Sequence, residues 1–347
     1  MKYHLSILHG VVAFSLFSFF APVASHAEGP YHLLKEIAVG GEGGWDYLSV
    51  DPVARRLYVS HATKVVAIDL DKETVVGEVA DTAGVHGMAL APELGRGFVS
   101  CGREDKVAIV DLKTLATLSK VTTEKNPDGI LFEPVQQEVY AFNGRGSSAT
   151  VIGAKSGKVI ATISLGGKPE FAVADSKAGR IYNNLEDKNE VVAIDIQRHE
   201  VVSRWPIAPG EEGSGMAFDA AHHRLFIGCG NKMMVMMDST TGKVVASVPI
   251  GGGVDANAFD PATQLAFASC GDGTTTIVRE DAPDKLTVVQ TLKTERGAKT
   301  MTIDPTTHKI YLGTAKFEAP APGQRRGKVV PGSFKILVYG MGGGDAK

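Results

Sequence analysis

Side chains that could hold a cation or move a proton recur along this chain at regular intervals. Seven equivalent positions lie 40 to 44 residues apart, and they are Asp46, His86, Asp128, Glu170, Ser214, Asp255 and Lys299. Carboxylates that share a site repel one another, so they either hold a hard cation or raise each other's pKa. A divalent cation is therefore the candidate cofactor, and Lys299 is expected to neutralise one carboxylate or to bind an anion. The alternative is a polar opening filled only with water.

A second set of equivalent positions lies fifteen residues further on and contains every cysteine of the chain. Its members are His61, Cys101, Asn143, Leu185, Cys229, Cys270 and Thr314. We expect Cys101, Cys229 and Cys270 to be buried, unpaired thiols, because cysteine ends a buried strand as a small hydrophobic residue. Two alternatives remain open: a Cys229–Cys270 disulfide in an oxidising compartment, or a metal bound by Cys101 together with His61 or His86.

Both sets are positioned by a sequence repeat. Residues 50–61 read VDPVARRLYVSH, residues 303–314 read IDPTTHKIYLGT, and five further copies lie between them. Most copies contain four short apolar runs; the third resembles VVAID (residues 65–69), and the fourth follows a turn such as Thr-Gly-Lys or Ser-Gly-Lys. Four short strands in a unit of about 40 to 45 residues are the signature of a β-propeller blade. The repeat therefore predicts an all-β protein, a seven-bladed β-propeller with four-stranded blades.

Turn residues and the two chain ends agree with this architecture. Asp-Pro after a strand predicts a tight reversal in which the Asp carboxylate accepts backbone N–H bonds, and Gly157 and Gly242 are expected at positive φ. The last copy lacks its fourth strand, whereas residues 32–39 (HLLKEIAV) precede the first inner strand without a partner. We expect this segment to complete the last blade, which closes the ring and removes open sheet edges.

The repeat resembles that of a known family. RLYVSH (residues 56–61) and KIYLGT (residues 309–314), with the downstream Ile-Asp and Thr-Gly-Lys-Val elements, are similar to the YVTN repeat of YncE-like seven-bladed propellers, although no copy reads Tyr-Val-Thr-Asn. The resemblance covers the chain after residue 27 and implies the propeller fold. It implies little about function, because such propellers serve binding, scaffolding and several enzyme activities.

The first 27 residues are expected to be a cleaved signal peptide. An apolar stretch follows Lys2, Pro22 interrupts it, and Ser25 and Ala27 place small residues at the −3 and −1 positions before Glu28. We therefore expect one propeller domain over residues 28–347, periplasmic or secreted, with no membrane span after cleavage. A membrane anchor is the alternative for this segment.

The first set of positions should meet at one face of the ring. In a propeller, each inner strand starts on the face where the loop from the previous blade arrives, and the loop after the second strand returns to that face. We expect the long loop at residues 316–333, which is rich in proline and basic residues, to arch over the same face; a disordered segment is the alternative. The predicted ligand-binding residues at the mouth of the central channel are Asp46, His61, His86, Asp128, Glu170, Asp255 and Lys299.

These features favour an exported binding or scaffold protein over an enzyme. We expect a monomer that binds a small-molecule or protein ligand at the channel mouth. The formal net charge of −3 gives no basis for nucleic acid as a partner. No GxSxG motif occurs, which disfavours a serine hydrolase. The alternative is a metal-assisted hydrolase or lactonase that uses the carboxylates of the channel mouth.

Overall fold

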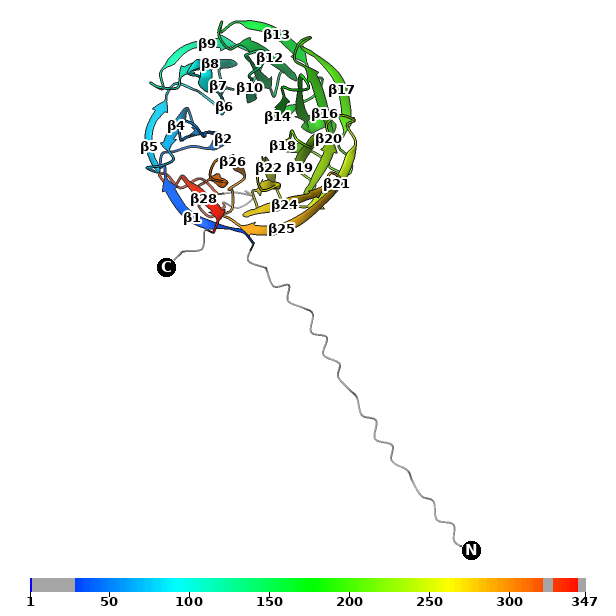
Figure 1. Cartoon of the computed structure of the whole chain (residues 1–347). Coiled ribbons are helices and arrows are strands. Elements are labelled where there is room, and N and C mark those ends of the chain that lie inside the picture. Colours follow the sequence, from blue (N-terminus) through cyan, green and yellow to red (C-terminus); the bar gives the residue numbers. More distant parts are fainter. Residues whose placement is uncertain (2–28, 321–326, 343–347) are drawn as a thin grey trace.

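Seven four-stranded antiparallel sheets are arranged in a ring (Figure 1). The computed structural model describes residue 1, residues 29–320 and residues 327–342. Within these residues the helical segments are two short 3-10 turns, η1 (Pro92–Leu94) and η2 (Glu186–Lys188), and no helix has the length and apolar character of a membrane span. The predicted all-β, seven-bladed propeller is confirmed. The expected signal peptide, residues 1–27, lies outside the described residues apart from residue 1.

Each of the first six blades is built from four consecutive strands, ordered from the inner to the outer edge. Blades 1 and 2 contain β2 (Trp45–Asp51), β3 (Arg56–His61), β4 (Lys64–Asp69), β5 (Thr74–Val79), then β6 (Val85–Ala91), β7 (Arg96–Cys101), β8 (Lys106–Asp111) and β9 (Thr117–Thr122). Blades 3 and 4 contain β10 (Pro127–Glu133), β11 (Glu138–Asn143), β12 (Ser148–Gly153), β13 (Val159–Ser164), then β14 (Pro169–Asp175), β15 (Arg180–Leu185), β16 (Glu190–Asp195) and β17 (Glu200–Pro206). Blades 5 and 6 contain β18 (Gly213–Asp219), β19 (Arg224–Cys229), β20 (Met233–Asp238), β21 (Val244–Pro249), then β22 (Val254–Asp260), β23 (Leu265–Cys270), β24 (Thr274–Ala282) and β25 (Lys285–Lys293).

Blade 7 combines strands from both ends of the chain, as predicted for residues 32–39. It consists of β26 (Thr300–Asp304), β27 (Lys309–Thr314), β28 (Lys335–Met341) and, outermost, β1 (Tyr31–Ala38). β1 and β28 are antiparallel, with Tyr31 opposite Met341 and Ala38 opposite Lys335. Tyr31 is 1% exposed, and its hydroxyl donates to the carbonyl of His308 at 2.8 Å. The ring is therefore closed between strands that lie at opposite ends of the sequence.

The core consists of seven apolar clusters, one between each pair of neighbouring blades. The third strand of each blade contributes to these clusters from both faces, so it reads as a continuous apolar run; in β4, Val65, Val66 and Ile68 are all buried. The outermost strand has one face in solvent, and β17 accordingly alternates exposed and half-buried residues. Packing between blades therefore uses both faces of each inner sheet strand, although a few polar residues, such as Thr150 and Asn183, are also buried in mid-strand.

The turn predictions are also confirmed. The Asp51 carboxylate accepts hydrogen bonds from the backbone N–H groups of Val53 at 3.0 Å and Ala54 at 2.9 Å, which stabilises the reversal between β2 and β3. Gly157 and Gly242 have φ of 63° and 72°, a conformation that glycine adopts without a steric penalty.

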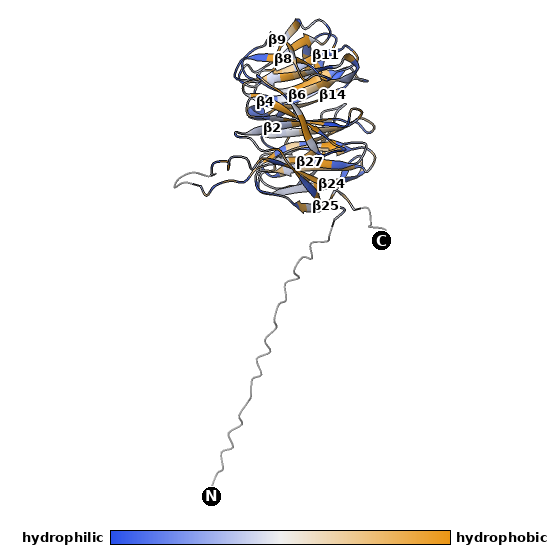
Figure 2. Ribbon diagram, turned by 90° about the vertical axis from the view of Figure 1, so that its left-hand side faces the viewer, coloured by the Kyte–Doolittle hydropathy of each residue, from blue (hydrophilic) through white to orange (hydrophobic). Residues whose placement is uncertain are grey.

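The long loop of blade 7 is attached at its base to the start of blade 1. An isolated bridge pairs Phe317 with Val329. The ring of Phe317 lies 6.1 Å from that of Trp45, and the N–H of Gly332 donates to the carbonyl of Gly41 at 2.9 Å. In the edge-on view of Figure 2 this segment leaves one face of the disc beside β27. The described part of the loop therefore lies on the face where β2 begins.

Candidate cation and ligand site at the channel mouth

The second residue of each inner strand lies at the channel mouth, which is the axial opening on the face where the loops between blades arrive. These residues are Asp46, His86, Asp128, Glu170, Ser214 and Asp255, and Lys299 directly precedes β26. In blades 1 to 6 the pairing of the inner strand with its neighbour shifts register across this position. A bulge of this kind releases a residue from the regular ladder and re-aims its side chain. The fold thus brings the first set of sequence positions to one opening.

Asp46, His86 and Asp128 form the closest group within this set. His86 Nδ1 lies 2.7 Å from Asp46 Oδ2 and 3.5 Å from Asp128 Oδ1. One potential ligand atom from each residue lies within 4.8 Å of the other two. The side chains are 28%, 27% and 19% exposed, so a small solute can reach them. Three consecutive blades therefore supply one ligand atom each to a point where a cation could bind.

Burial and neighbouring charges alter the proton affinity of this group. Burial raises the pKa of Asp128 to about 6, and the Asp46 carboxylate adds to the rise although His86 opposes it. The pKa of His86 is also raised, because burial, which lowers it, is outweighed by the hydrogen bond to Asp46 and by the charge of Asp128. The group therefore holds a proton into the neutral range. A divalent cation would have to displace that proton.

Tyr47 extends from blade 1 toward blade 4. Its ring stacks on Phe171 with a centroid separation of 4.5 Å. Its hydroxyl is buried and has no hydrogen-bond partner among the residues that the structure describes. Burial, and then the negative charges of Asp128 and the three other carboxylates of the set, raise the pKa of Tyr47 well above its usual value. Tyr47 therefore lies centrally among the carboxylates and keeps one unused O–H donor.

Glycines on the intervening blades leave room for Tyr47. A Cβ added to Gly87 would lie 3.6 Å from the Tyr47 ring. A Cβ added to Gly129 would lie 3.0 Å from the carbonyl oxygen of Glu170 and 3.3 Å from the Tyr47 hydroxyl. Contacts of 3.0 Å are closer than carbon and oxygen normally approach. The path of the tyrosine across the opening thus depends on the absence of a side chain at Gly129, whereas the distance at Gly87 is an ordinary van der Waals contact.

Glu170 is paired with a lysine outside the predicted set. Lys168 Nζ lies 2.7 Å from Glu170 Oε1 and also contacts Glu186 of η2. Burial raises the pKa of Glu170 to about 7, and the charge of Asp128 adds to the rise although Lys168 opposes it. Glu170 is therefore a carboxyl group that gains and loses its proton near neutral pH.

Asp255 is paired with Lys299, which is one of the two roles expected for that lysine. The Nζ–Oδ1 distance is 2.9 Å. Burial raises the pKa of Asp255, whereas Lys299 lowers it. The channel mouth is thus divided into a group open to a cation, in blades 1 to 3, and two carboxylates that already have a lysine partner.

A cleft of about 500 Å³ opens beside the Asp46–His86–Asp128 group. Its lining includes Asp46, His86, Arg103, Asn126 and Arg145. Neither guanidinium group has an ion pair or hydrogen bond within the part of the chain that the structure describes. A guanidinium group binds carboxylates and phosphates through a planar fork of N–H donors. The cleft therefore combines a candidate cation site with two guanidinium groups that form no ion pair or hydrogen bond there, although the charge of Arg145 also acts on Asp105.

His61 does not reach this opening. It is 1% exposed, its Nδ1 lies 3.1 Å from the carbonyl oxygen of Gly44, and its ring stacks on Phe334 with a centroid separation of 4.5 Å. Burial lowers the pKa of His61. The other members of the second set also end the second strand of a blade and are buried. This set therefore lies inside the blades and not at the channel mouth.

The three cysteines are free and buried. Each thiol donates to the carbonyl group two residues earlier in its own strand, at 3.5 or 3.6 Å. They belong to three separate core clusters, and burial raises the pKa of Cys101 to about 11 and of Cys229 and Cys270 to about 12. Among the described residues, Cys101 forms no ligand group with His61 or His86. The thiols occupy the sites of small hydrophobic residues at strand ends.

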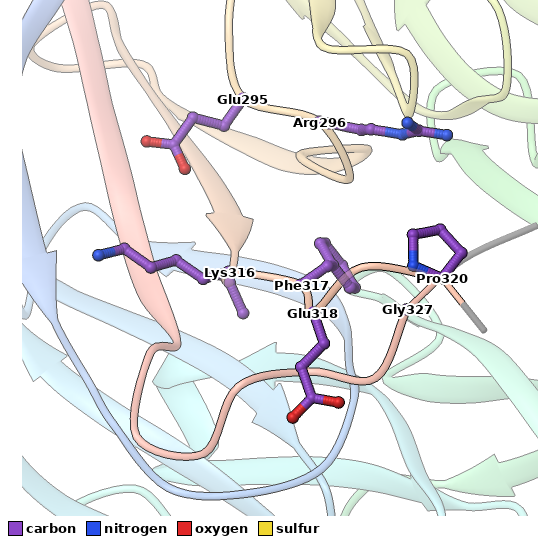
Figure 3. Close-up of a pocket in the computed structure, with 8 residues that line it drawn as sticks. Glu295, Arg296, Lys316, Phe317, Glu318, Pro320 and Gly327 are labelled. Carbon is purple, nitrogen blue, oxygen red and sulfur yellow. The ribbon is translucent and has the colours of Figure 1, made fainter.

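A second cleft of about 500 Å³ lies beside the long loop of blade 7 (Figure 3). Glu295 and Arg296 lie on one side of it, and Phe317 lies on the other. Its lining also includes Pro320 and Gly327, which flank residues 321–326, outside the described part of the chain. We assign no site to this cleft.

Counting along the repeat missed Tyr47, Lys168, Arg103 and Arg145. Tyr47 directly follows the mouth residue Asp46, whereas blades 2, 3 and 5 have glycine at that position. A large side chain among equivalent glycines could have marked Tyr47 as a residue of the site. Arg103 and Arg145 share a further equivalent position, two residues after the second set. Lys168 belongs to a loop whose length differs between blades, and no regularity marks it.

Comparison with known proteins bears on the fold alone. No family model and no curated protein matches the chain. A chain of the solved structure described as "Crystal Structure of Mitotic Checkpoint Complex" matches with a TM-score of 0.72 at 14% identity, over 96% of this chain and 99% of that chain. "Structure of U3-55K" and "Crystal structure of RRP9 WD40 repeats" match with TM-scores of 0.72 and 0.73 at 10% and 9% identity, each over 89% of this chain and 98% of the other. The protein is a seven-bladed β-propeller with the architecture of WD40-repeat propellers.

Proposed function

We propose that this protein is an exported propeller of the YVTN type that binds an anionic small molecule at its channel mouth through a divalent cation. One observation carries the proposal: Asp46, His86 and Asp128, from three successive blades, place ligand atoms within 4.8 Å of one another at the edge of a cleft that also contains Arg103 and Arg145.

The ligand set indicates which cation to expect. Two carboxylates and one imidazole provide three protein ligands and leave positions open for water or a bound anion. Imidazole favours zinc and its neighbours in the first transition series over calcium and magnesium, which prefer oxygen ligands. Because the raised pKa of His86 and of Asp128 means that a proton competes with the cation, binding should strengthen between pH 6 and pH 8.

The cleft indicates the class of ligand. A metal ion with an open position attracts an anionic donor, and the guanidinium groups of Arg103 and Arg145 line the same cleft without a hydrogen bond or ion pair to the described residues. Carboxylate and phosphate groups fit both features. A cleft of about 500 Å³ is in the size range of small-molecule sites.

The test is metal titration of protein stripped with a chelator, followed by calorimetry and thermal melting with zinc, manganese, calcium and magnesium. Asp46→Asn and Asp128→Asn should each weaken zinc binding at the mouth at least about 100-fold, since loss of a supporting residue alone costs 10- to 100-fold. Asp255→Asn is the matched control, because it removes a carboxylate at the same strand position that already has Lys299 as its partner. Unchanged zinc affinity in both the Asp46→Asn and the Asp128→Asn variants would refute the cation site.

Anion binding is tested on the zinc-loaded protein. Inorganic phosphate and citrate should bind more weakly when Arg103 and Arg145 are both replaced by alanine, with zinc affinity unchanged. Equal anion affinity in the wild type and in this variant would show that the cation acts without the arginines.

Metal-assisted hydrolysis is the second candidate, and Glu170 is the observation that favours it. A carboxyl group with a pKa raised to about 7 can accept a proton from a metal-bound water at neutral pH. If this is the activity, zinc-loaded protein should open simple lactones, a chelator should stop the reaction, and Glu170→Gln should abolish it while zinc remains bound. Lack of turnover over a lactone panel would leave binding as the function.

Export is tested by N-terminal sequencing of protein secreted or released from the periplasm of the expressing cell. The expected mature N-terminus is Glu28. An intact N-terminus on a membrane-bound protein would favour the anchor.

A further inference from the structure

Glu280 departs from the repeat at a position where the other blades place apolar or small residues. Its N–H donates to the carbonyl of Gln264 at 3.1 Å, which is the hydrogen bond that the residue after the third strand makes in other blades. The residues that make the equivalent bond are Leu70, Leu112, Ala154, Ile196 and Ser239. Each of these five is buried beside a neighbouring blade. Blade 6 alone of these six introduces a carboxylate there.

This carboxylate is buried without a hydrogen-bond donor. Glu280 is 7% exposed, and neither of its carboxylate oxygens accepts a hydrogen bond from a donor among the described residues. Burial and the adjoining carboxyl group of Asp219 raise the pKa of Glu280. Burying an unpaired charge is strongly unfavourable, so such a group is normally neutralised by a proton, a cationic side chain or a metal ion. The positive charge of Arg224 acts on Glu280, but its guanidinium group contacts Asp238 at 2.7 Å and the carbonyl of Pro283 at 2.6 Å instead.

Two further ligand atoms face Glu280 from blade 5. Asp219 Oδ1 accepts a hydrogen bond from the N–H of Ala221 at 2.9 Å, which stabilises the turn after β18. Asp219 Oδ2 lies 2.5 Å from His222 Nδ1. One oxygen of Glu280, one of Asp219 and one nitrogen of His222 all lie within 4.8 Å of one another. The His222 side chain is 47% exposed, so the group is open to solvent from one side.

An aspartate–histidine pair alone does not mark a site on this face. His308 Nδ1 lies 2.8 Å from Asp260 Oδ2 between blades 6 and 7, in the same type of turn. The group in blades 5 and 6 differs by a third, buried acid, to which no described residue donates a hydrogen bond. That difference requires an explanation that the repeat itself does not provide.

We propose that Asp219, His222 and Glu280 bind a divalent transition-metal ion of the zinc class, on the face opposite the channel mouth. Two carboxylates neutralise the charge of the ion, the imidazole supplies a nitrogen ligand, and water reaches the remaining position from the exposed side of His222. The ion would join blade 5 to blade 6 and so stabilise the native ring. The site is independent of the channel mouth, because it shares no residue with it.

Substitutions separate this site from the mouth. In an Asp128→Asn background, which removes the mouth site, chelator-stripped protein should bind about one equivalent of zinc and melt at a higher temperature when zinc is present. Adding His222→Ala or Glu280→Gln should weaken that binding at least about tenfold. His223→Ala is the matched control, since its side chain is 48% exposed, is the next residue in the chain, and lies 3.9 Å from Asp175 instead. The cobalt-loaded protein should lose its visible absorption in the first two variants only.

The competing explanation is a proton shared between Glu280 and Asp219. The shared-proton explanation predicts that zinc does not raise the melting temperature in the Asp128→Asn background. That result would overturn the metal site. Equal zinc affinity of the His222→Ala and His223→Ala proteins would overturn it as well. Because His222 is exposed, its replacement should leave the fold intact, so this comparison decides the matter even if Glu280→Gln prevents folding. Zinc binding that persists in Asp128→Asn and disappears in His222→Ala supports this site whatever the outcome at the mouth.

Discussion

Replacing Asp128 and Glu170 by their amides should make the cation-free protein more stable at neutral pH and should change little in acid. The pKa of Asp128 is raised from 3.8 to about 6 and that of Glu170 from 4.5 to about 7, chiefly by burial. A carboxyl group with a raised pKa keeps its proton in the native state when the unfolded chain has already lost it. Stability is therefore lost as the pH rises from about 4 to about 7, and the Asp128→Asn, Glu170→Gln variant avoids that loss.

The magnitude follows from the two shifts. Each exceeds two pKa units, and one unit corresponds to about 1.4 kcal/mol, so each ionised carboxylate destabilises the native state by about 3 kcal/mol. The side chains are 19% and 15% exposed, so screening by solvent reduces these values only in part. Part of the rise in the pKa of Glu170 comes from the charge of Asp128, so the joint effect is smaller than twice the single effect. We expect the double variant to gain about 3 to 5 kcal/mol at pH 8.

Urea unfolding in the presence of a chelator, followed by tryptophan fluorescence, measures this difference. The free energies of unfolding of the two proteins should agree at pH 4 and diverge steadily up to pH 7. Other titrating groups, Glu280 among them, are present in both proteins and cancel. A difference that is the same at pH 4 and pH 8, or a variant that is less stable at pH 8, would refute the assignment of these groups as carboxylates that burial destabilises when they are ionised.

Three further outcomes are expected. Deleting residues 30–38 removes β1 and exposes the partners of Tyr31, so the free energy of unfolding should fall by at least about 3 kcal/mol and the protein should aggregate; an unchanged melting temperature would contradict ring closure. Arg55→Ala removes the guanidinium group that lies 2.6 Å from Asp304, whose side chain is 0% exposed, and should lower the free energy of unfolding in urea by about 3 kcal/mol. A loss below about 1 kcal/mol would show that the carboxylate finds another partner. The three buried thiols should react with a thiol reagent only after denaturation, and a modified cysteine or a disulfide-linked peptide in the mass spectrum of native protein would contradict their burial.

The residues of the channel mouth were predictable because the sequence repeat shows where each inner strand begins and which blade it belongs to. Once Asp51 and Asp304 are recognised as the same turn residue, counting back five residues identifies Asp46 and Lys299 in the first and last blades. The same counting could not show that His61 is buried. The end of the second strand and the start of the loop that follows it fall at the same repeat position, so the repeat does not say whether a residue there faces the core or the channel mouth. Its burial depends on Phe334, which lies far away in sequence.

The pairings at the mouth were not predictable, because they depend on side-chain reach from outside the repeat positions. Tyr47 of blade 1 gains its place from the absence of a side chain at Gly129, which belongs to blade 3. Lys168 reaches Glu170 from a connecting loop. The unusual position of Glu280 is visible only in the structure, where a backbone hydrogen bond identifies the equivalent residues of the other blades.

The seam in blade 7 determines when folding can be completed. Blades 1 to 6 are made of consecutive strands and can assemble as the chain becomes available, but β1 has no partner until β28 has been delivered. Pairing Tyr31 with Met341 closes a loop of nearly the whole chain, with an entropic cost of about 5 kcal/mol from its length alone. The final closure is therefore one late step that a truncated or partly delivered polypeptide cannot take. For a chain that crosses a membrane in the unfolded state, as proposed above, this delay prevents a finished ring from forming before the last strand has been translocated.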